Sequence, residues 1–125
     1  MIQVINNYQC GTGFDVLHCH DTWKIAFISY AEQYADLKQL KRHTKTDEAF
    51  LLIKGEAVLF SSDDGEKTEK IFLEKEKLYV VKKNTWHHLT LSCDALILVV
   101  ENSDTSKENT ETKVLTEKEI NEVKK

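Results

Sequence analysis

Short stretches rich in aromatic and β-branched residues recur along this chain at intervals of about eight to twelve residues, with turn-forming residues between them. The stretches are WKIAFISYAEQY at 23–34, EAFLLIKGEAVLF at 48–60, KLYVV at 77–81, WHHLTLS at 86–92 and ALILVVE at 95–101. Ser61 to Gly65 contain an Asp-Gly turn, which predicts a β-hairpin returning through EKTEKIFLE. Spacing of this kind favours an antiparallel sandwich or barrel over a sheet of βαβ units.

The end of the chain differs in composition from these apolar stretches. After Glu101 the sequence becomes polar, reading NSDTSKENTETK, which indicates a tail laid along the surface. Thr116 and Glu119 then have the spacing of a capping box, in which two side chains bond each other's backbone at the start of a helix. A short C-terminal helix is therefore predicted.

Length and charge limit what the chain can be. Its 125 residues give room for one domain with a single core. We expect that domain to span 1–125, with a barrel over about 1–101, opened by a strand at MIQVI, and a polar tail and short helix over about 102–125. The formal net charge of -4 is spread along the chain, so we expect no nucleic-acid or membrane partner. Without a leader-like start or a bilayer-length apolar run, a cytoplasmic location is expected.

The segment from Lys41 to Gly55 combines a histidine, a pair of carboxylates and an apolar run that ends in glycine. A turn between His43 and Glu48 would let both side chains point from adjoining strands into one cavity. His87 follows much later, between two apolar stretches. Two imidazoles and one carboxylate make an open metal site, because three protein ligands leave positions free for water or substrate.

Side-chain alternation along the stretch at 86–92 predicts which residues lie on the same side of the strand as His87. An inward His87 places Leu89 and Leu91 inward, with His88 and Thr90 outward. An apolar wall with one histidine fits a ligand pocket, and it also fits a core histidine satisfied by a single hydrogen bond. The residues alone leave both interpretations open.

These residues resemble the motifs of the cupin family. His43 matches the second histidine of the first cupin motif, Glu48 its glutamate and Gly55 its closing glycine. Lys41 stands where the family has another histidine, and Ala35 where it has a leading glycine.

Of the second cupin motif, the chain keeps the histidine, as His87. The other positions of that motif are occupied by Glu76, Lys82, Asn84 and Leu91. Asn84 departs least from the motif, since asparagine tolerates the left-handed conformation that otherwise calls for glycine.

The resemblance implies an all-β fold, the cupin-type double-stranded β-helix or jelly-roll barrel, as in small single-domain cupins of the mannose-6-phosphate-isomerase-like type, with a short C-terminal helix added. It also implies a divalent metal, Zn, Fe, Mn or Ni, held by His43, Glu48 and His87. A further implication is a homodimer, formed through an exchanged N-terminal strand. Lys41, Phe50 and Trp86 are assigned to the wall that binds the small-molecule ligand.

The functional interpretations differ in the role of Lys41, because placing its ammonium close to a divalent cation costs free energy. Either Lys41 turns away and the metal binds, or Lys41 pairs with Glu48 and no metal is held. The first case, which we favour, predicts a protein that binds or transforms a small oxygen-rich molecule, such as a sugar or keto acid.

Two further functions stay open. One is metal-free isomerase or epimerase chemistry on a sugar nucleotide, with His43 or His87 as base, Tyr79 as acid and Lys41 steering an anionic group. The other is a non-catalytic carrier or sensor of a small ligand. The residues do not decide whether the protein is an enzyme.

Overall fold

The structure, a computed structural model, describes residues 1–6 and 13–125. Strands and short helices follow one another in the described part as β1 (Phe14–His20), β2 (Trp23–Ser29), the 3-10 helix η1 (Glu32–Tyr34), β3 (Gln39–His43), β4 (Glu48–Lys54), β5 (Ala57–Ser62), β6 (Glu69–Phe72), β7 (Leu78–Val81), β8 (Trp86–Leu91), β9 (Leu96–Asn102), the 3-10 helix η2 (Lys107–Asn109), β10 (Thr110–Val114) and the α-helix α1 (Glu117–Lys124).

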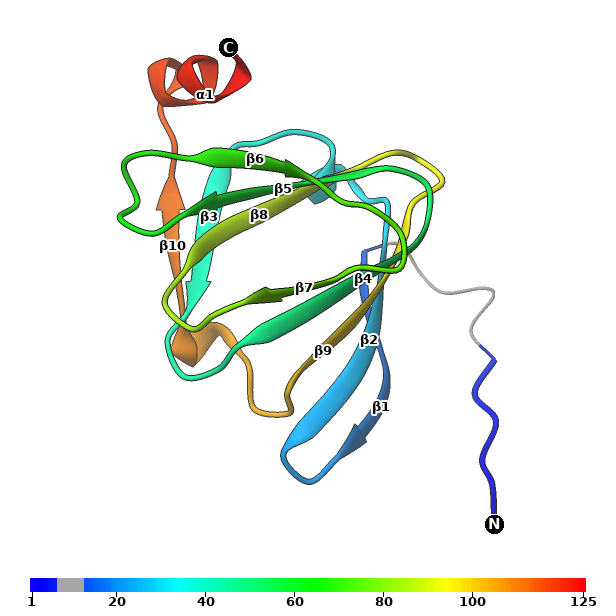
Figure 1. Ribbon diagram of the computed structural model, residues 1–125. Helices are drawn as coiled ribbons and strands as arrows, with labels where there is room; N and C mark the ends of the chain where they lie inside the picture. The colour runs from blue at the N-terminus through cyan, green and yellow to red at the C-terminus, as the bar shows by residue number, and fades with distance from the viewer. Residues whose placement is uncertain (7–12) are drawn as a thin grey trace.

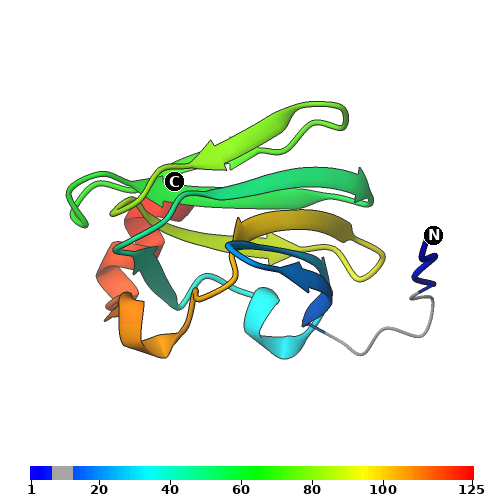
Figure 2. The same cartoon turned by 90° about the horizontal axis from the view of Figure 1, so that it is seen from below.

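The strands form two five-stranded sheets that lie face to face (Figures 1 and 2). The first sheet has the order β1-β2-β9-β4-β7, and the second has the order β10-β3-β8-β5-β6. Strand pairing is antiparallel throughout the described residues, and the β5–β6 hairpin pairs as its Asp-Gly turn predicted. The two antiparallel sheets and the short C-terminal helix confirm the predicted jelly-roll class, although the sheets do not close into a continuous barrel.

The main core lies between the two sheets, because alternate residues of each strand point inward. In β4 the inward residues are Glu48, Phe50 and Leu52, and in β9 they are Ile97, Val99 and Glu101. Phe50, Ile97 and Val99 are 2% exposed or less. Two glutamates therefore occupy inward positions at one end of an otherwise apolar layer.

The C-terminal region adds more to the fold than a surface tail. Residues 110–114 form β10, an edge strand that pairs with β3 along its full length, with Thr110 opposite His43. Helix α1 then starts at the capping box of Thr116 and Glu119, as predicted. Its apolar side packs on the outer face of the second sheet, beside Leu40 and Phe60. In the described part of the chain, no helix has the length and apolar character needed to cross a membrane.

The N-terminal prediction was wrong for the residues that are described. MIQVI was expected as a strand, but residues 1–6 are exposed, form no strand and extend away from the sheets (Figure 1). Positions 7–12 lie outside the described residues.

Candidate functional site

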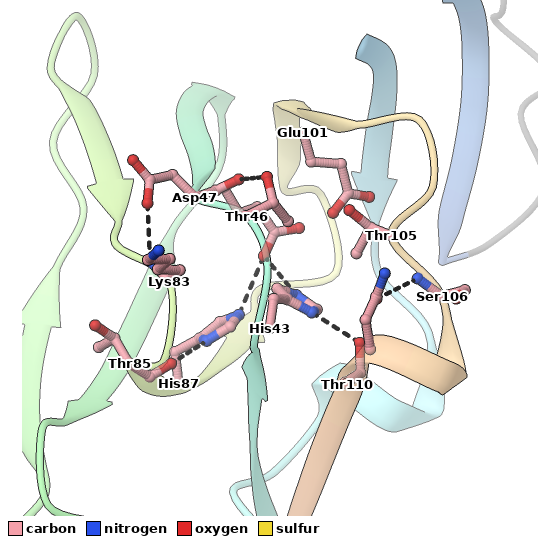
Figure 3. Close-up of polar contacts among 12 residues, drawn as sticks. His43, Thr46, Asp47, Lys83, Thr85, His87, Glu101, Thr105, Ser106 and Thr110 are labelled. Carbon is pink, nitrogen blue, oxygen red and sulfur yellow. Dashed lines mark hydrogen bonds and ion pairs between the residues drawn. The ribbon is translucent and has the colours of Figure 1, made fainter. Parts of the chain in front are cut away.

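The structure brings His43, Glu48 and His87 together from three strands, β3, β4 and β8. One ligand atom from each side chain lies within 4.8 Å of the other two. Both histidine Nε2 atoms meet the same carboxylate oxygen, Glu48 Oε1, at 3.2 Å from His43 and 3.1 Å from His87 (Figure 3). Glu48 and His87 are buried, and His43 is half-buried.

The loops beside the site hold these strands in place. Asp47 accepts a hydrogen bond from the Lys83 backbone N–H at 2.8 Å. Its carboxylate also forms an ion pair with the Lys82 ammonium at 2.6 Å. The Asn84 N–H donates to the His43 carbonyl at 2.8 Å, and Asn84 has φ 67, the left-handed conformation expected of it. The β3–β4 and β7–β8 connections are thereby joined at Asp47 and at the His43 carbonyl.

The partner of Nδ1 in each histidine indicates which ring nitrogen carries the hydrogen. His87 Nδ1 lies 3.0 Å from the Thr85 carbonyl, which can only accept, so Nδ1 carries a hydrogen. In a neutral imidazole the other nitrogen, Nε2, then presents a lone pair to the Glu48 oxygen. Two acceptors at this distance require a cation between them or a second proton on His87.

His43 is more adaptable than His87. Its Nδ1 lies 2.9 Å from the Thr110 hydroxyl, which can donate or accept. His43 can therefore be satisfied as either tautomer, including the one that leaves Nε2 free for a metal.

The charge of Glu48 is set by opposing effects. Burial raises the pKa of this carboxyl, but hydrogen bonds and positive charge from His43 and His87 outweigh burial and lower the pKa to about 2. Glu48 is thus a carboxylate at any physiological pH, as a metal ligand must be.

Glu101 lies directly opposite Glu48 in the β4–β9 pair and points to the same side. Burial and the Glu48 charge raise the pKa of Glu101 to about 8. Its Oε1 lies 3.8 Å from the Lys24 ammonium, which also donates to the Thr105 carbonyl at 3.2 Å. Glu101 Oε2 and Thr105 Oγ1 are both buried; a side-chain hydrogen bond with Glu48 raises the pKa of Glu101 further, and one with Thr105 lowers it.

A cavity of about 730 Å³ opens over these groups, a size typical of small-molecule sites. Its apolar lining comes from Phe14, Val16, Ile28, Phe50 and Leu89. Its polar lining includes Lys24, Gln39, Lys41, Thr105 and Thr112, in addition to the histidines and glutamates.

Two of the predicted wall residues line this cavity. Lys41 lies opposite His87 in the β3–β8 pair, and the Phe50 ring centre is 6.3 Å from that of His87. The alternative in which Lys41 pairs with Glu48 was wrong: Lys41 is exposed, and across the described residues its ammonium makes no ion pair with Glu48. Glu48 instead hydrogen-bonds the histidines, because the His87 side chain extends from β8 to Glu48 Oε1.

Tyr79 and Trp86 are not among the described residues that line the cavity, and their roles as acid and ligand contact stay predictions. The Tyr79 hydroxyl accepts from the Glu74 N–H at 3.0 Å, and its ring packs on the main core. Trp86 lies on the face of β8 opposite to His87, where it packs in the cluster under α1 with the Arg42 guanidinium 4.5 Å from its ring.

Several residues of the cavity were missed from the sequence. Glu101 could have been found, since the alternation Ile97, Val99, Glu101 puts it on the buried face of its strand. Thr105 and Thr110 gave no such signal, because their segment has only polar residues and its place depends on pairing with β3.

Comparison with known proteins bears on the fold. No protein-family model matches the sequence, and no curated protein matches it. A cupin-2 domain protein from Shewanella frigidimarina matches in structure with a TM-score of 0.58 at 18% identity, over 72% of this chain and 79% of that chain. The nucleoside dehydratase Pac13 from Streptomyces matches with a TM-score of 0.65 at 10% identity, over 94% of this chain and 97% of that chain.

The TDP-quinovose 3,4-ketoisomerase WlaRB from Campylobacter jejuni also matches, with a TM-score of 0.58 at 16% identity, over 78% of this chain and 73% of that chain. Identities of this size establish the fold alone. Two facing antiparallel sheets with a histidine–glutamate–histidine cluster between them define the class as a jelly roll with an internal site. Within that class, the chain has the fold of a small cupin.

Proposed function

We propose that this protein holds a divalent metal through His43, Glu48 and His87, and there binds or transforms a small oxygen-rich molecule. The observation that carries the proposal is the orientation of His87. Its Nδ1–H is committed to the Thr85 carbonyl, so in the neutral imidazole the Nε2 lone pair and the Glu48 carboxylate converge on one point, whereas a second proton on Nε2 would bond Glu48 without a metal. A first-row divalent cation accepts both kinds of ligand.

The surroundings of the three side chains support the same proposal. A backbone carbonyl behind a metal-binding histidine fixes the tautomer and ring orientation, and the Thr85 carbonyl provides this contact for His87. The Thr110 hydroxyl orients the His43 ring and allows either tautomer. Lys41 is exposed and can direct its charge to solvent. A metal bound at such a site polarises ligand oxygens and leaves coordination positions open.

The metal-free isomerase interpretation has less support. It needs an acid opposite the histidine base, and the predicted acid, Tyr79, has its hydroxyl bonded to the Glu74 N–H outside the cavity lining. A non-catalytic carrier or sensor of a small ligand would use the same cavity, and specific binding without turnover in protein that retains no metal would favour it.

Metal analysis tests the proposal directly. Untagged protein purified without chelator is expected to retain close to one equivalent of Zn, Fe, Mn or Ni by inductively coupled plasma mass spectrometry. After chelator treatment, adding that metal at a hundred times its dissociation constant should restore about 2.7 kcal/mol of stability in thermal unfolding. Failure of all four metals to be retained and to raise the melting temperature would contradict the proposal.

We also propose that the protein is a homodimer, and the outer face of the first sheet supports this. Exposed faces of antiparallel sheets are normally polar, but here two rows of apolar residues cross four strands. The rows are Ile25, Val100, Ala49 and Val80, and Phe27, Leu98, Leu51 and Leu78. Leu78, Val80 and Val100 are 64%, 48% and 40% exposed.

A second copy of this chain is the occupant that fits the face best. The outer face of the second sheet has α1 packed on it, whereas both rows are apolar across β2, β9, β4 and β7, and Asp15 of β1 borders the second row opposite Phe27. A two-fold axis lets the identical rows of two copies meet, so the same apolar residues cover each other.

Replacing Leu98 with lysine is expected to raise the dimer dissociation constant at least about tenfold, because two ammonium groups would enter one apolar interface. Sedimentation velocity over a dilution series measures the change. Val114→Lys is the matched control, since Val114 is 74% exposed on the edge of the other sheet. Wild-type protein that sediments as a monomer at all concentrations would refute the interface.

A further inference from the structure

Two lysines at the open side of the cavity carry positive charges that the protein leaves without an ion pair. Lys41 and Lys107 both line the cavity, and both side chains are exposed. Across the described residues, neither ammonium forms an ion pair or a hydrogen bond. Glu108, the neighbour of Lys107 in sequence, is exposed and is not among the described residues that line the cavity. Both ammonium groups are therefore available to a ligand.

The backbone on both sides of the cavity mouth is fixed by pairing and by a buried side chain. Lys41 lies in β3, opposite Thr112 of β10, and both residues line the cavity. Lys107 lies in η2, the 3-10 helix that leads into β10. Asn109 is only 8% exposed, and its side-chain oxygen accepts from the Ser106 N–H at 2.9 Å, which closes η2 on itself. The two lysines therefore start from a rigid wall.

The charges that line the cavity favour an anionic ligand. Three ammonium groups, of Lys24, Lys41 and Lys107, face the carboxyl groups of Glu48 and Glu101. With both carboxyl groups ionised the lining is still net positive, although the chain as a whole has a net charge of -4. A divalent cation bound at the histidines would add to this positive charge. A cleft lined by an excess of one sign attracts ligands of the opposite sign.

We infer that Lys41 and Lys107 form an anion-binding subsite at the mouth of the cavity, and that the ligand is a small organic anion whose carboxylate or phosphate group binds there. The inference rests on the proposed function, because it names the ligand class of the same cavity. The Thr112 hydroxyl and the Gln39 amide line the same wall and can donate to such a group. The lysine that replaces a motif histidine at position 41 thereby binds the ligand instead of the metal.

Two matched pairs of small molecules test the inference. Pyruvate and methyl pyruvate share a keto group, but only pyruvate is charged; glycerol phosphate and glycerol differ in the same way. Calorimetry and ligand-observed NMR should show at least about fivefold tighter binding of the charged member in one pair or both, the upper end of what an exposed ion pair contributes. The pair that shows the preference identifies the bound group as carboxylate or phosphate. Added salt should weaken binding of the charged member only, because it screens exposed charges.

Lysine variants assign the preference to the subsite. Lys41→Gln and Lys107→Gln should each weaken binding of the charged molecule about fivefold and leave binding of its neutral partner unchanged. Neither lysine forms an ion pair among the described residues, so both variants should melt at the wild-type temperature. Lys75→Gln is the matched control, since Lys75 is exposed and is not among the described residues that line the cavity.

Two outcomes overturn the inference. One is the same affinity for the charged and neutral members of both pairs, or no binding of any of the four molecules. The other is a preference for the anion that persists unchanged in either lysine variant, since the metal or another group would then hold it. Measurements on metal-loaded and chelator-treated protein keep the two proposals apart. Lysine-dependent anion binding in protein that retains no metal upholds the subsite and refutes the metal proposal, whereas retained metal without lysine-dependent binding does the reverse.

Discussion

Protein in which His87 is replaced by alanine is expected to bind its divalent metal at least about a hundredfold more weakly than wild type. Loss of an outer-shell partner already costs about 10- to 100-fold in metal affinity, and His87 would be a direct ligand. Its Nε2 lies 3.1 Å from Glu48 Oε1, and its lone pair is directed there by the Thr85 carbonyl. Competition with a chromophoric chelator, read by absorbance, measures the dissociation constant of each protein.

His20→Ala is the matched control for this experiment. His20 is an exposed histidine at the end of β1, outside the cluster, so the same substitution removes an imidazole without touching the site. Circular dichroism of both variants checks that the sheets remain folded. Equal metal affinity in His87→Ala and wild type would show that the cation binds elsewhere or not at all.

The position of the cluster follows from rules that the sequence already contains. Side-chain alternation within β4 and β8 puts Glu48 and His87 on inward faces, and the β3–β4 turn brings His43 beside them. The same alternation points Trp86 outward, although the sequence analysis assigned it to the ligand wall, and its packing under α1 depends on where the helix lies. What the motif does not specify is which neighbour pairs with Glu48, because that depends on how β8 lies against β3 and β4.

The contribution of the segment after Glu101 could not be predicted from its composition. Residues 110–114 have no alternating apolar pattern, yet they form β10 because β3 offers an unpaired edge. This pairing supplies the Thr110 hydroxyl to His43. The loop before β10 likewise supplies Thr105 to the cavity. Tertiary pairing, rather than local propensity, therefore completes the wall of the site.

Backbone conformation explains two of the departures from the second cupin motif. Glu76 and Asn84, which stand at motif positions, have φ 69 and φ 67. Asparagine adopts this left-handed conformation at small conformational cost, whereas the cost for glutamate is higher. The turn geometry at position 76 is thus retained without glycine, with a conformational cost of about 1–2 kcal/mol.

Gly55, the closing glycine of the first motif, is expected to tolerate no side chain. Gly55→Ala should lower the free energy of unfolding by about 2–5 kcal/mol, measured by urea denaturation, through two effects. Gly55 has φ 77, where a residue with Cβ pays about 1–2 kcal/mol. A Cβ there would also lie 2.5 Å from Ala95 Cα and 2.7 Å from Ala95 N, and overpacking of this kind costs about 1–3 kcal/mol.

Gly13→Ala separates the two effects. Gly13 has φ 89, so alanine there pays a similar conformational cost, but its Cβ would meet the Ala31 Cβ at an ordinary 3.6 Å. This control should therefore lose only about 1–2 kcal/mol. The additional loss of unfolding free energy at Gly55 measures how closely the β4–β5 turn packs on the β8–β9 turn. At that contact the Ser92 N–H donates to the Glu56 carbonyl, and the Ser92 hydroxyl accepts from the Glu56 N–H. Equal losses in the two variants would mean that Ala95 moves aside freely, and that the glycine serves the turn conformation alone.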